Sequence, residues 1–187
     1  MEHKLTDKKL KDKRYRRTEA AIIRAFSLVQ DKFNAQRIIK TAKISRSTLY
    51  RHHGTVYRIA LNYEEYINNK YRRLSKKLIR KKLNPRFIYQ RTLVFIMVNQ
   101  QIVKFVMDYN NSGIIEKMLI NLSPLVTSSG RIKNKTILDI CIKEMTALVE
   151  EWFSDGCDKN SIITVADKLA QLVGTANSRL IDIVKPE

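Results

Sequence analysis

Residues 35–54 read AQRIIKTAKISRSTLYRHHG and decide how the first part of the chain folds. Apolar residues at helical spacing predict a short helix over residues 35–42. Ser45 follows a break in that pattern and is placed to cap a second short helix over residues 46–52, which Gly54 ends. Two short helices joined by a tight turn form the helix-turn-helix pattern.

The segments on either side of this pair are also predicted to be helical. Thr18 and Glu19 predict a helix start, because a hydroxyl can cap a helix and an acid favours the first turn. Phe33 is the last residue of the apolar pattern of that helix. After the pair, a long helix is predicted over residues 56–83. Its predicted inward residues are Ile59, Tyr63, Tyr66 or Ile67, and Leu74.

The rest of the chain predicts helices only. Asn84 can cap the next helix and Pro85 suits its first position. Five Gly and three Pro in 187 residues are too few turn signals for a many-stranded fold. We therefore expect an all-α protein, with an N-terminal three-helix domain and a larger helical C-terminal domain. The later predicted helices cover residues 86–109, 114–126, 136–153 and 161–184.

Charge is distributed unevenly along the chain. Residues 1–91 hold 26 Lys or Arg against 7 acids, a net of +19, whereas residues 92–187 hold 10 bases against 11 acids, a net of −1. Solubility does not require such segregation, so the first half is expected to bind a polyanion. DNA, RNA and an anionic membrane surface all fit this composition.

The second helix of the pair, residues 46–52, has side chains suited to contacting DNA. In a helix-turn-helix this helix enters the major groove, which is about 12 Å wide. Leu49 can anchor inward while the polar side chains project outward. Arg can bind guanine through two hydrogen bonds, Ser or Thr can bind a base or a phosphate, and Tyr can contact a phosphate or a thymine methyl group. The outward residues are Arg46, Ser47, Tyr50 and Arg51.

These residues carry a family resemblance. Residues 17–59 resemble the DNA-binding domain of the TetR family of bacterial repressors, which shows the run I-A-x-x-A-G-V-S-x-x-T-L/F-Y-x-H/Y-F-x-x-K at this point. Ile44-Ser45, Thr48-Leu49-Tyr50 and His52 fall in register with that run, and Thr18, Phe26 and Phe33 also fit.

Three positions depart from the family pattern. Lys43 stands where the family has Gly, so a left-handed turn residue there costs roughly 1 kcal/mol more. His53 replaces an aromatic Phe, and Val56 stands where the family places a phosphate-contacting Lys. Either Tyr57 or Arg58 is expected to take the role of that lysine, or the basic N-terminal arm is expected to compensate for it.

The resemblance implies a homodimeric transcriptional repressor, cytoplasmic and bacterial, that binds a pseudo-palindromic operator. The dimer is expected to form through residues 136–153 and 161–184, and a small molecule or another signal in the second domain is expected to release the DNA. The implied domains are a basic arm (1–17), a DNA-binding domain (18–62) and a ligand-binding and dimerisation domain (63–187). The predicted DNA contacts are Arg17, Thr18, Arg37, Ser45, Arg46, Ser47, Thr48, Tyr50, Arg51, His52, Tyr57 and Arg58, and the candidate ligand pocket is Tyr89, Phe95, Met97, Met107, Met118 and Trp152.

Other functions have weaker support in the sequence. Catalysis, a metal and a cofactor are not expected, because adjacent His52 and His53 diverge on a helix and Cys141 and Cys157 have no nearby ligand partner. A basic helical protein that binds RNA or organises DNA without an effector is the serious alternative, given the Lys/Arg-rich tract at residues 72–82. Such an RNA-binding protein would expose aromatic residues for base stacking. Membrane binding is not expected, because the helix at 56–83 has no exposed Trp or Phe opposite its basic face.

Overall fold

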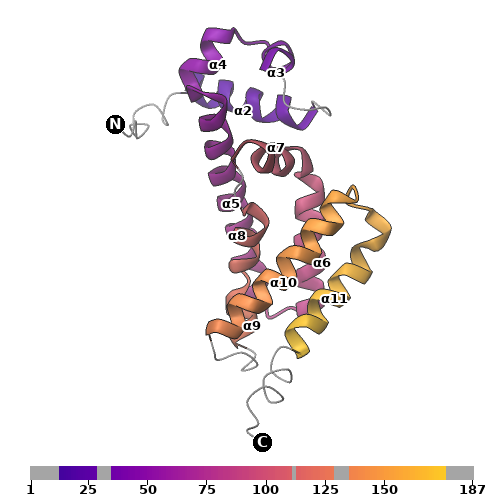
Figure 1. Cartoon of the computed structure of the whole chain (residues 1–187). Coiled ribbons are helices and arrows are strands. Elements are labelled where there is room, and N and C mark those ends of the chain that lie inside the picture. Colours follow the sequence, from indigo (N-terminus) through magenta and orange to yellow (C-terminus); the bar gives the residue numbers. More distant parts are fainter. Residues whose placement is uncertain (1–12, 29–34, 111–112, 129–134, 176–187) are drawn as a thin grey trace, which may run out of the picture. The chain divides into compact units, whose positions relative to one another are not determined.

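The computed structural model describes residues 13–28, 35–110, 113–128 and 135–175, and all secondary structure within these ranges is helical (Figure 1). The expected all-α class is therefore confirmed. The helices are α2 (Lys13–Leu28), α3 (Ala35–Ala42), α4 (Arg46–His53), α5 (Val56–Arg80), α6 (Pro85–Val98), α7 (Gln100–Asn110), α8 (Ile114–Ile120), α9 (Ser123–Ser128), α10 (Lys135–Ser154), the 3₁₀ turn η1 (Lys159–Ser161) and α11 (Ile162–Thr175).

The chain divides into two compact units. The first comprises residues 1–63 and 101–111, and the second comprises residues 64–100 and 112–187. The predicted domains divide the chain between residues 62 and 63, and they place the whole of α7 in the second domain. Helix α5 is continuous and supplies residues to both units.

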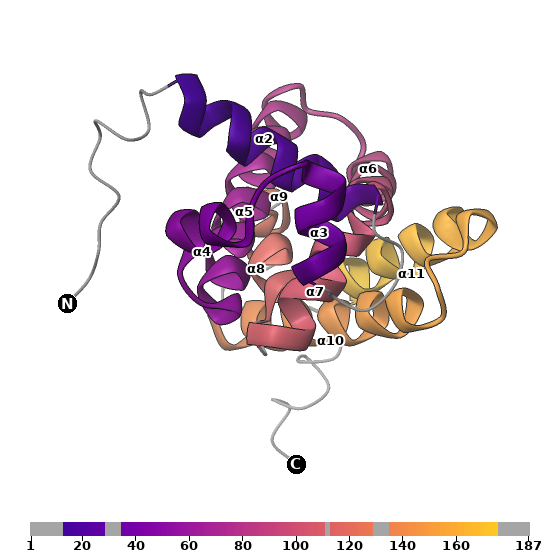
Figure 2. The same ribbon diagram turned by 90° about the horizontal axis from the view of Figure 1, so that it is seen from above.

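In the first unit, α2 packs against α3, and α3 contacts α4 (Figure 2). Each of these helices, and the start of α5, contributes a fully or almost fully buried aliphatic side chain. Removing these side chains from water provides the main stabilisation of the unit. They are Ile22, Ile38, Leu49 and Ile59.

In the second unit, α11 packs against α6 and α10, and α10 also packs against α8. Helices α10 and α11 run side by side (Figure 1). Ion pairs also link helices of this unit: Arg86 of α6 pairs with Asp167 of α11, and Lys117 of α8 pairs with Glu64 of α5. The interior is otherwise largely aliphatic, with Ile67, Ile88, Leu93, Ile96, Ile114 and Leu119 almost completely buried.

Several predicted helix boundaries are confirmed. Helix α3 covers residues 35–42 as predicted, and α4 begins at Arg46 after the Ser45 cap. The Asn84 side chain accepts a hydrogen bond from the Arg86 N–H, with Pro85 at the first helical position of α6. The long helix α5 begins at Val56 and ends three residues before the predicted end.

The predicted helix start at Thr18 is wrong. Helix α2 already includes Lys13, and the Thr18 hydroxyl donates to the Arg14 carbonyl at 3.0 Å instead of capping a helix start. A threonine in the middle of a helix can donate its hydroxyl hydrogen bond to the carbonyl four residues earlier. The sequence alone does not distinguish this arrangement from a helix cap.

The prediction of a single helix over residues 86–109 is also wrong. The Asn99 side chain donates to the Phe95 carbonyl at 2.6 Å and accepts from Lys70 Nζ at 3.2 Å. The Asn99 N–H is shared between the Phe95 and Ile96 carbonyls, Asn99 has a φ of −108° and a ψ of 16°, and α6 ends at Val98. The predicted helix over 114–126 is likewise divided into α8 and α9, because Pro124 lacks the N–H that a continuous helix needs. The predicted helix over 161–184 starts with η1 and α11, and its residues beyond 175 lie outside the described ranges.

Candidate nucleic-acid interface

The turn between α3 and α4 depends on a left-handed residue. Lys43 has a φ of 53°, and the N–H of Ile44 donates to the Ile39 carbonyl at 3.1 Å, which closes the end of α3. This is the position at which the family pattern has Gly and at which the sequence predicted a strained turn. The turn therefore forms with lysine, at the cost that an L-residue carries in this conformation.

Helix α4 is fixed at both of its ends. The Ser45 hydroxyl accepts from the Thr48 N–H at 3.0 Å, and it also lies 2.9 Å from the Ser47 hydroxyl and 2.8 Å from the Thr48 hydroxyl. At the other end Gly54 has a φ of 73°, and its N–H donates to the Tyr50 carbonyl. Glycine adopts this conformation without a steric penalty, so the helix stops after two turns.

The outward face of α4 carries the predicted contact residues. Arg46, Ser47 and Arg51 are exposed, while Leu49 is completely buried as predicted. The Arg46 guanidinium lies 5.6 Å from the centre of the Tyr50 ring, a cation–π distance that orients both side chains. Arg51 Nη2 lies 3.5 Å from the Thr48 hydroxyl.

A recess of about 650 Å³ lies between α2 and the α3–α4 turn. Its lining includes three cationic side chains and no acid, so it is an electropositive concavity beside the outward face of α4. Hydroxyl groups next to the cations add further donors for an anionic oxygen. The lining residues are Arg14, Tyr15, Thr18, Lys43, Ile44, Ser45, Thr48, Arg51 and His52.

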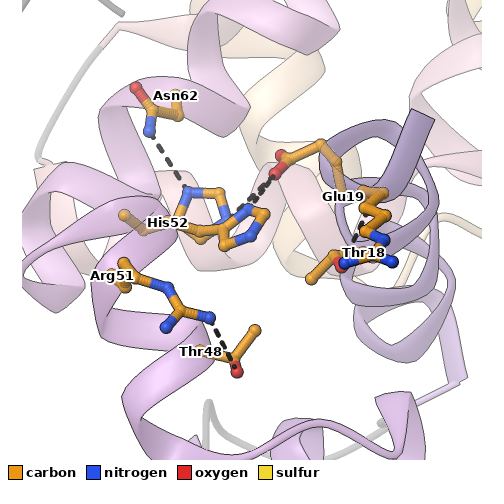
Figure 3. A network of polar contacts seen from close by, with 8 residues as sticks. Thr18, Glu19, Thr48, Arg51, His52 and Asn62 are labelled. Atoms are coloured by element: carbon orange, nitrogen blue, oxygen red, sulfur yellow. Dashed lines mark hydrogen bonds and ion pairs between the residues drawn. The ribbon is translucent and has the colours of Figure 1, made fainter. Parts of the chain in front are cut away.

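Behind this face, two histidines hold the end of α4 against α2 (Figure 3). Glu19 Oε2 of α2 lies 3.3 Å from His53 Nε2 and 3.8 Å from His52 Nδ1. The Tyr15 ring stacks on the His52 ring, with centroids 4.3 Å apart and an interplanar angle of 11°. Asn62 of α5 donates from Nδ2 to His53 Nδ1 at 3.2 Å. We call Tyr15, Glu19, His52, His53 and Asn62 the histidine cluster.

The hydrogen bond between Asn62 and His53 fits one tautomer of the His53 ring. Because Nδ1 accepts from Asn62, the ring proton lies on Nε2, where it faces the Glu19 carboxylate. The ring is buried and stacks near Tyr63, with centroids 6.0 Å apart. His53 is thus packed as an aromatic side chain, with a hydrogen bond from Asn62 at Nδ1 and the Glu19 carboxylate 3.3 Å from Nε2. The family pattern marks residue 53 as a departure, but the sequence does not indicate Glu19 or Asn62 as neighbours of His53.

Burial within the cluster also shifts the pKa values of two of its members, His52 and Tyr15. Burial lowers the pKa of His52, and it outweighs the opposing effect of the Glu19 carboxylate. Burial, followed by the charge of Glu19, raises the pKa of the Tyr15 hydroxyl. The neutral forms of both rings are therefore favoured in the folded protein.

The predicted DNA-contact residues all belong to the first unit. Arg17 lies exposed on α2 and Arg37 on α3, while Tyr57 and Arg58 lie exposed at the start of α5. Thr18, Thr48 and Tyr50 are half-buried. The His52 side chain is only 9% exposed and lies within the histidine cluster.

The predicted ligand-pocket residues do not share one cavity among those described. Met107 belongs to the first unit and the other members belong to the second. Trp152 is buried with its indole N–H donating to Ser161 Oγ at 2.9 Å, and Tyr89 and Met118 are completely buried. Met97 is half-buried, and Phe95 lines an open groove that is considered below.

The aromatic residues near the basic tract of α5 are mostly internal. Tyr63 and Tyr71 are buried, and Tyr71 bonds to Thr92 in the interior of the second unit at 2.8 Å. Tyr66 is 38% exposed and lies beneath Lys70. The tract therefore presents exposed cations with little aromatic surface for base stacking.

Within the part of the chain that the structure describes, no three His, Cys, Asp or Glu residues are grouped to hold a metal ion. No helix in those ranges is both long and apolar enough to cross a membrane. Both cysteines are buried, and burial raises the pKa of the Cys157 thiol to about 11. No protein-family model matches the chain, and no curated protein or solved structure matches it either.

Proposed function

We propose that the protein is a homodimeric transcriptional regulator that binds double-stranded DNA at specific sequences through α4 and acts most simply as a repressor. The observation that carries this proposal is the geometry of α4: a short helix capped by Ser45, anchored by Leu49, and exposing Arg46, Ser47 and Arg51. Such a helix has the size and the donor groups to read base edges in a major groove.

The charge of the first unit supports the same proposal. Its residues hold 17 Lys or Arg against 6 acids, a net of +11. Cations next to a reading helix neutralise phosphates and fix the register of the protein on the duplex. In this proposal, Arg46 and Arg51 contact bases or nearby phosphates, while Arg17, Arg37 and Arg58 contact the DNA backbone.

The histidine cluster fits this function as a positioning device. Specific recognition requires the reading helix to keep one orientation relative to the rest of its domain. The hydrogen bond between Asn62 and His53 joins α5 to α4, and the Glu19 carboxylate of α2 lies 3.3 Å from His53 Nε2, so polar contacts add to apolar packing in orienting α4.

Dimerisation is proposed through α10 and α11, where apolar side chains remain uncovered. Ile140 of α10 is 53% exposed and Ile163 of α11 is 55% exposed. Between the two helices lies a groove lined in part by Ala147, Leu148 and Leu172. A two-fold dimer through this face would present two α4 helices to DNA sites about 34–36 Å apart. A small molecule or another signal that changes this separation would release the DNA.

The test is a selection of bound sequences from a random duplex pool, repeated over a series of salt concentrations. The proposal predicts enrichment of a pseudo-palindrome whose half-sites lie about one helical turn apart. Salt-sensitive binding with no enriched sequence would contradict it.

A second function has one specific observation in its favour. Arg72, Arg73, Lys76, Lys77, Arg80, Lys81 and Lys82 are all exposed, so α5 and its end form a long basic surface. A protein that binds RNA or organises DNA through charge would use this surface and would need no effector. The same selection separates the two functions, because charge-based binding enriches no sequence.

A further inference from the structure

The second unit contains a groove between the C-terminal half of α5 and α6. Its volume is about 580 Å³, which is within the range of pockets that bind small molecules. None of the predicted DNA contacts lines it. The lining residues are Lys70, Leu74, Lys77, Leu78, Lys81, Leu83, Phe87, Arg91, Val94, Phe95, Val98 and Asn99.

The floor of the groove is apolar and partly uncovered. Val98 is 71% exposed and Phe87 is 38% exposed, while Leu74 and Val94 are half-buried. A ligand that covered these side chains would remove hydrocarbon surface from water, which is favourable in proportion to the area covered.

The rim of the groove is cationic. Lys70, Lys77, Lys81 and Arg91 line it, and no acidic residue does. Lys70 already donates to Asn99, and Arg91 stacks over Phe87 at 5.0 Å. Lys77 and Lys81 form no ion pair with any residue in the described ranges, so their charges are available to an anion.

The apolar floor and the cationic rim together favour one kind of ligand. A second copy of the chain placed on the same face would bring like charges together, which opposes association. A nucleic-acid backbone would satisfy the cations but leave the apolar floor exposed. A single hydrocarbon chain with an anionic head satisfies both parts, because its tail covers the floor and its head meets the lysines.

We infer that this groove binds a single-chain amphiphile with an anionic head group, of which a fatty acid is the simplest example. Lys77 and Lys81 bind the head group, and Leu74, Phe87, Val94 and Val98 contact the chain. This binding does not depend on the proposed DNA-binding function, since the groove and α4 belong to different units.

The experiment is calorimetric titration of the full chain with decanoate, kept below its micelle-forming concentration. We expect saturable binding of one decanoate per chain and at least tenfold weaker binding of decanol, which has the same chain length without the charge. A tenfold change corresponds to ~1.4 kcal/mol. Equal binding of the acid and the alcohol, or no binding of decanoate, would overturn the inference.

Two pairs of substitutions locate the site. Lys77→Gln with Lys81→Gln should weaken decanoate binding about tenfold, as expected when charge-assisted contacts are lost. Arg73→Gln with Lys76→Gln is the matched control: it makes the same charge change at exposed residues of α5 outside the lining, and should alter binding less than about twofold. Equal losses in both variants would indicate general charge attraction and overturn the assignment.

Val98→Glu tests the apolar floor, because it places an acid among the groove's cations at an exposed position that folding does not depend on. It should abolish decanoate binding.

Two measurements distinguish other occupants of the groove. If the protein sediments with phosphatidylglycerol vesicles but does not bind dissolved decanoate, the groove is part of a membrane-binding face instead. Self-association that Val98→Glu removes would show an interface between copies. Either result would overturn the inference.

Discussion

The two units keep their helices in place in different ways. In the first, the reading helix α4 is joined to α2 and α5 through buried or half-buried titratable groups, Glu19, His52 and His53. In the second, most buried polar groups are neutral and bond to carbonyls of their own helix, as Ser75 and Thr92 do. Among the residues that the structure describes, the Glu64–Lys117 ion pair is the charged exception. Polar side chains thus contribute to the position of α4, whereas the second unit depends mainly on apolar burial.

The largest expected effect on stability comes from substitutions in the apolar cores, since each unit has such a core. Leu93→Ala in α6 and Leu49→Ala in α4 each remove a completely buried side chain. Each should lower the free energy of unfolding by about 2–5 kcal/mol, measured by urea denaturation. Leu28→Ala, at a residue that is 64% exposed, is the control and should change it by less than about 0.5 kcal/mol. A loss below ~1 kcal/mol at either buried leucine would contradict the packing described here.

The second-largest effect on stability is expected in the first unit only, at the histidine cluster. Glu19→Ala removes the carboxylate that lies 3.3 Å from the buried Nε2 of His53, so it should lower the free energy of unfolding by about 1–3 kcal/mol in the same assay. Glu65→Ala, at an exposed position on α5, should have little effect. Adding His53→Phe to Glu19→Ala should recover part of the loss, because the unpaired polar group is then removed. Strictly additive losses would show that Glu19 and His53 are not coupled.

A smaller effect is expected at the left-handed lysines, one in each unit. Lys43 has a φ of 53° and Lys82 a φ of 50°. Lys43→Gly and Lys82→Gly should each raise the free energy of unfolding by about 0.5–1 kcal/mol, since glycine adopts this conformation without strain. Lys40→Gly, within α3, should instead lower it by about 1 kcal/mol. A loss at Lys43 or Lys82 would contradict the turn geometry.

The smallest effect is a pH dependence specific to the first unit. Burial lowers the pKa of His52 in the folded protein, so the unfolded chain takes up a proton first as the pH falls through about 6.5. The free energy of unfolding should therefore decrease from about pH 7.5 to about pH 5.5. His52→Gln should show a shallower decrease over this range. An unchanged slope in the variant would rule out His52 as the source.

The comparison of the units also explains what the sequence could predict. The helix pair at residues 35–54 and its serine cap are local features that follow from residues close together in the chain, whereas the left-handed turn at Lys43 was expected from the family resemblance. The break at Asn99 could not be foreseen, because its side chain is held by Lys70, which is 29 residues earlier.

The histidine cluster was missed for a similar reason. Glu19 and His53 are 34 positions apart, and only the packing of α2 against the following helices brings them together. His53 was recognised as a departure from the family pattern, but a single sequence does not show which distant residue compensates for it. The groove beside α6 was missed because apolar lining residues look like ordinary core residues until their exposure is known.

The central claim is that α4 reads DNA sequence, and one substitution tests it directly. Arg46→Ala should weaken binding to the selected duplex by about 1–3 kcal/mol and relax the preference at the bases it contacts. Lys159→Ala, which removes the same charge from an exposed position in η1, outside the first unit and outside α10 and α11, should leave both unchanged. Equal affinity and equal sequence preference for Arg46→Ala and Lys159→Ala would contradict the assignment of α4 as the reading helix.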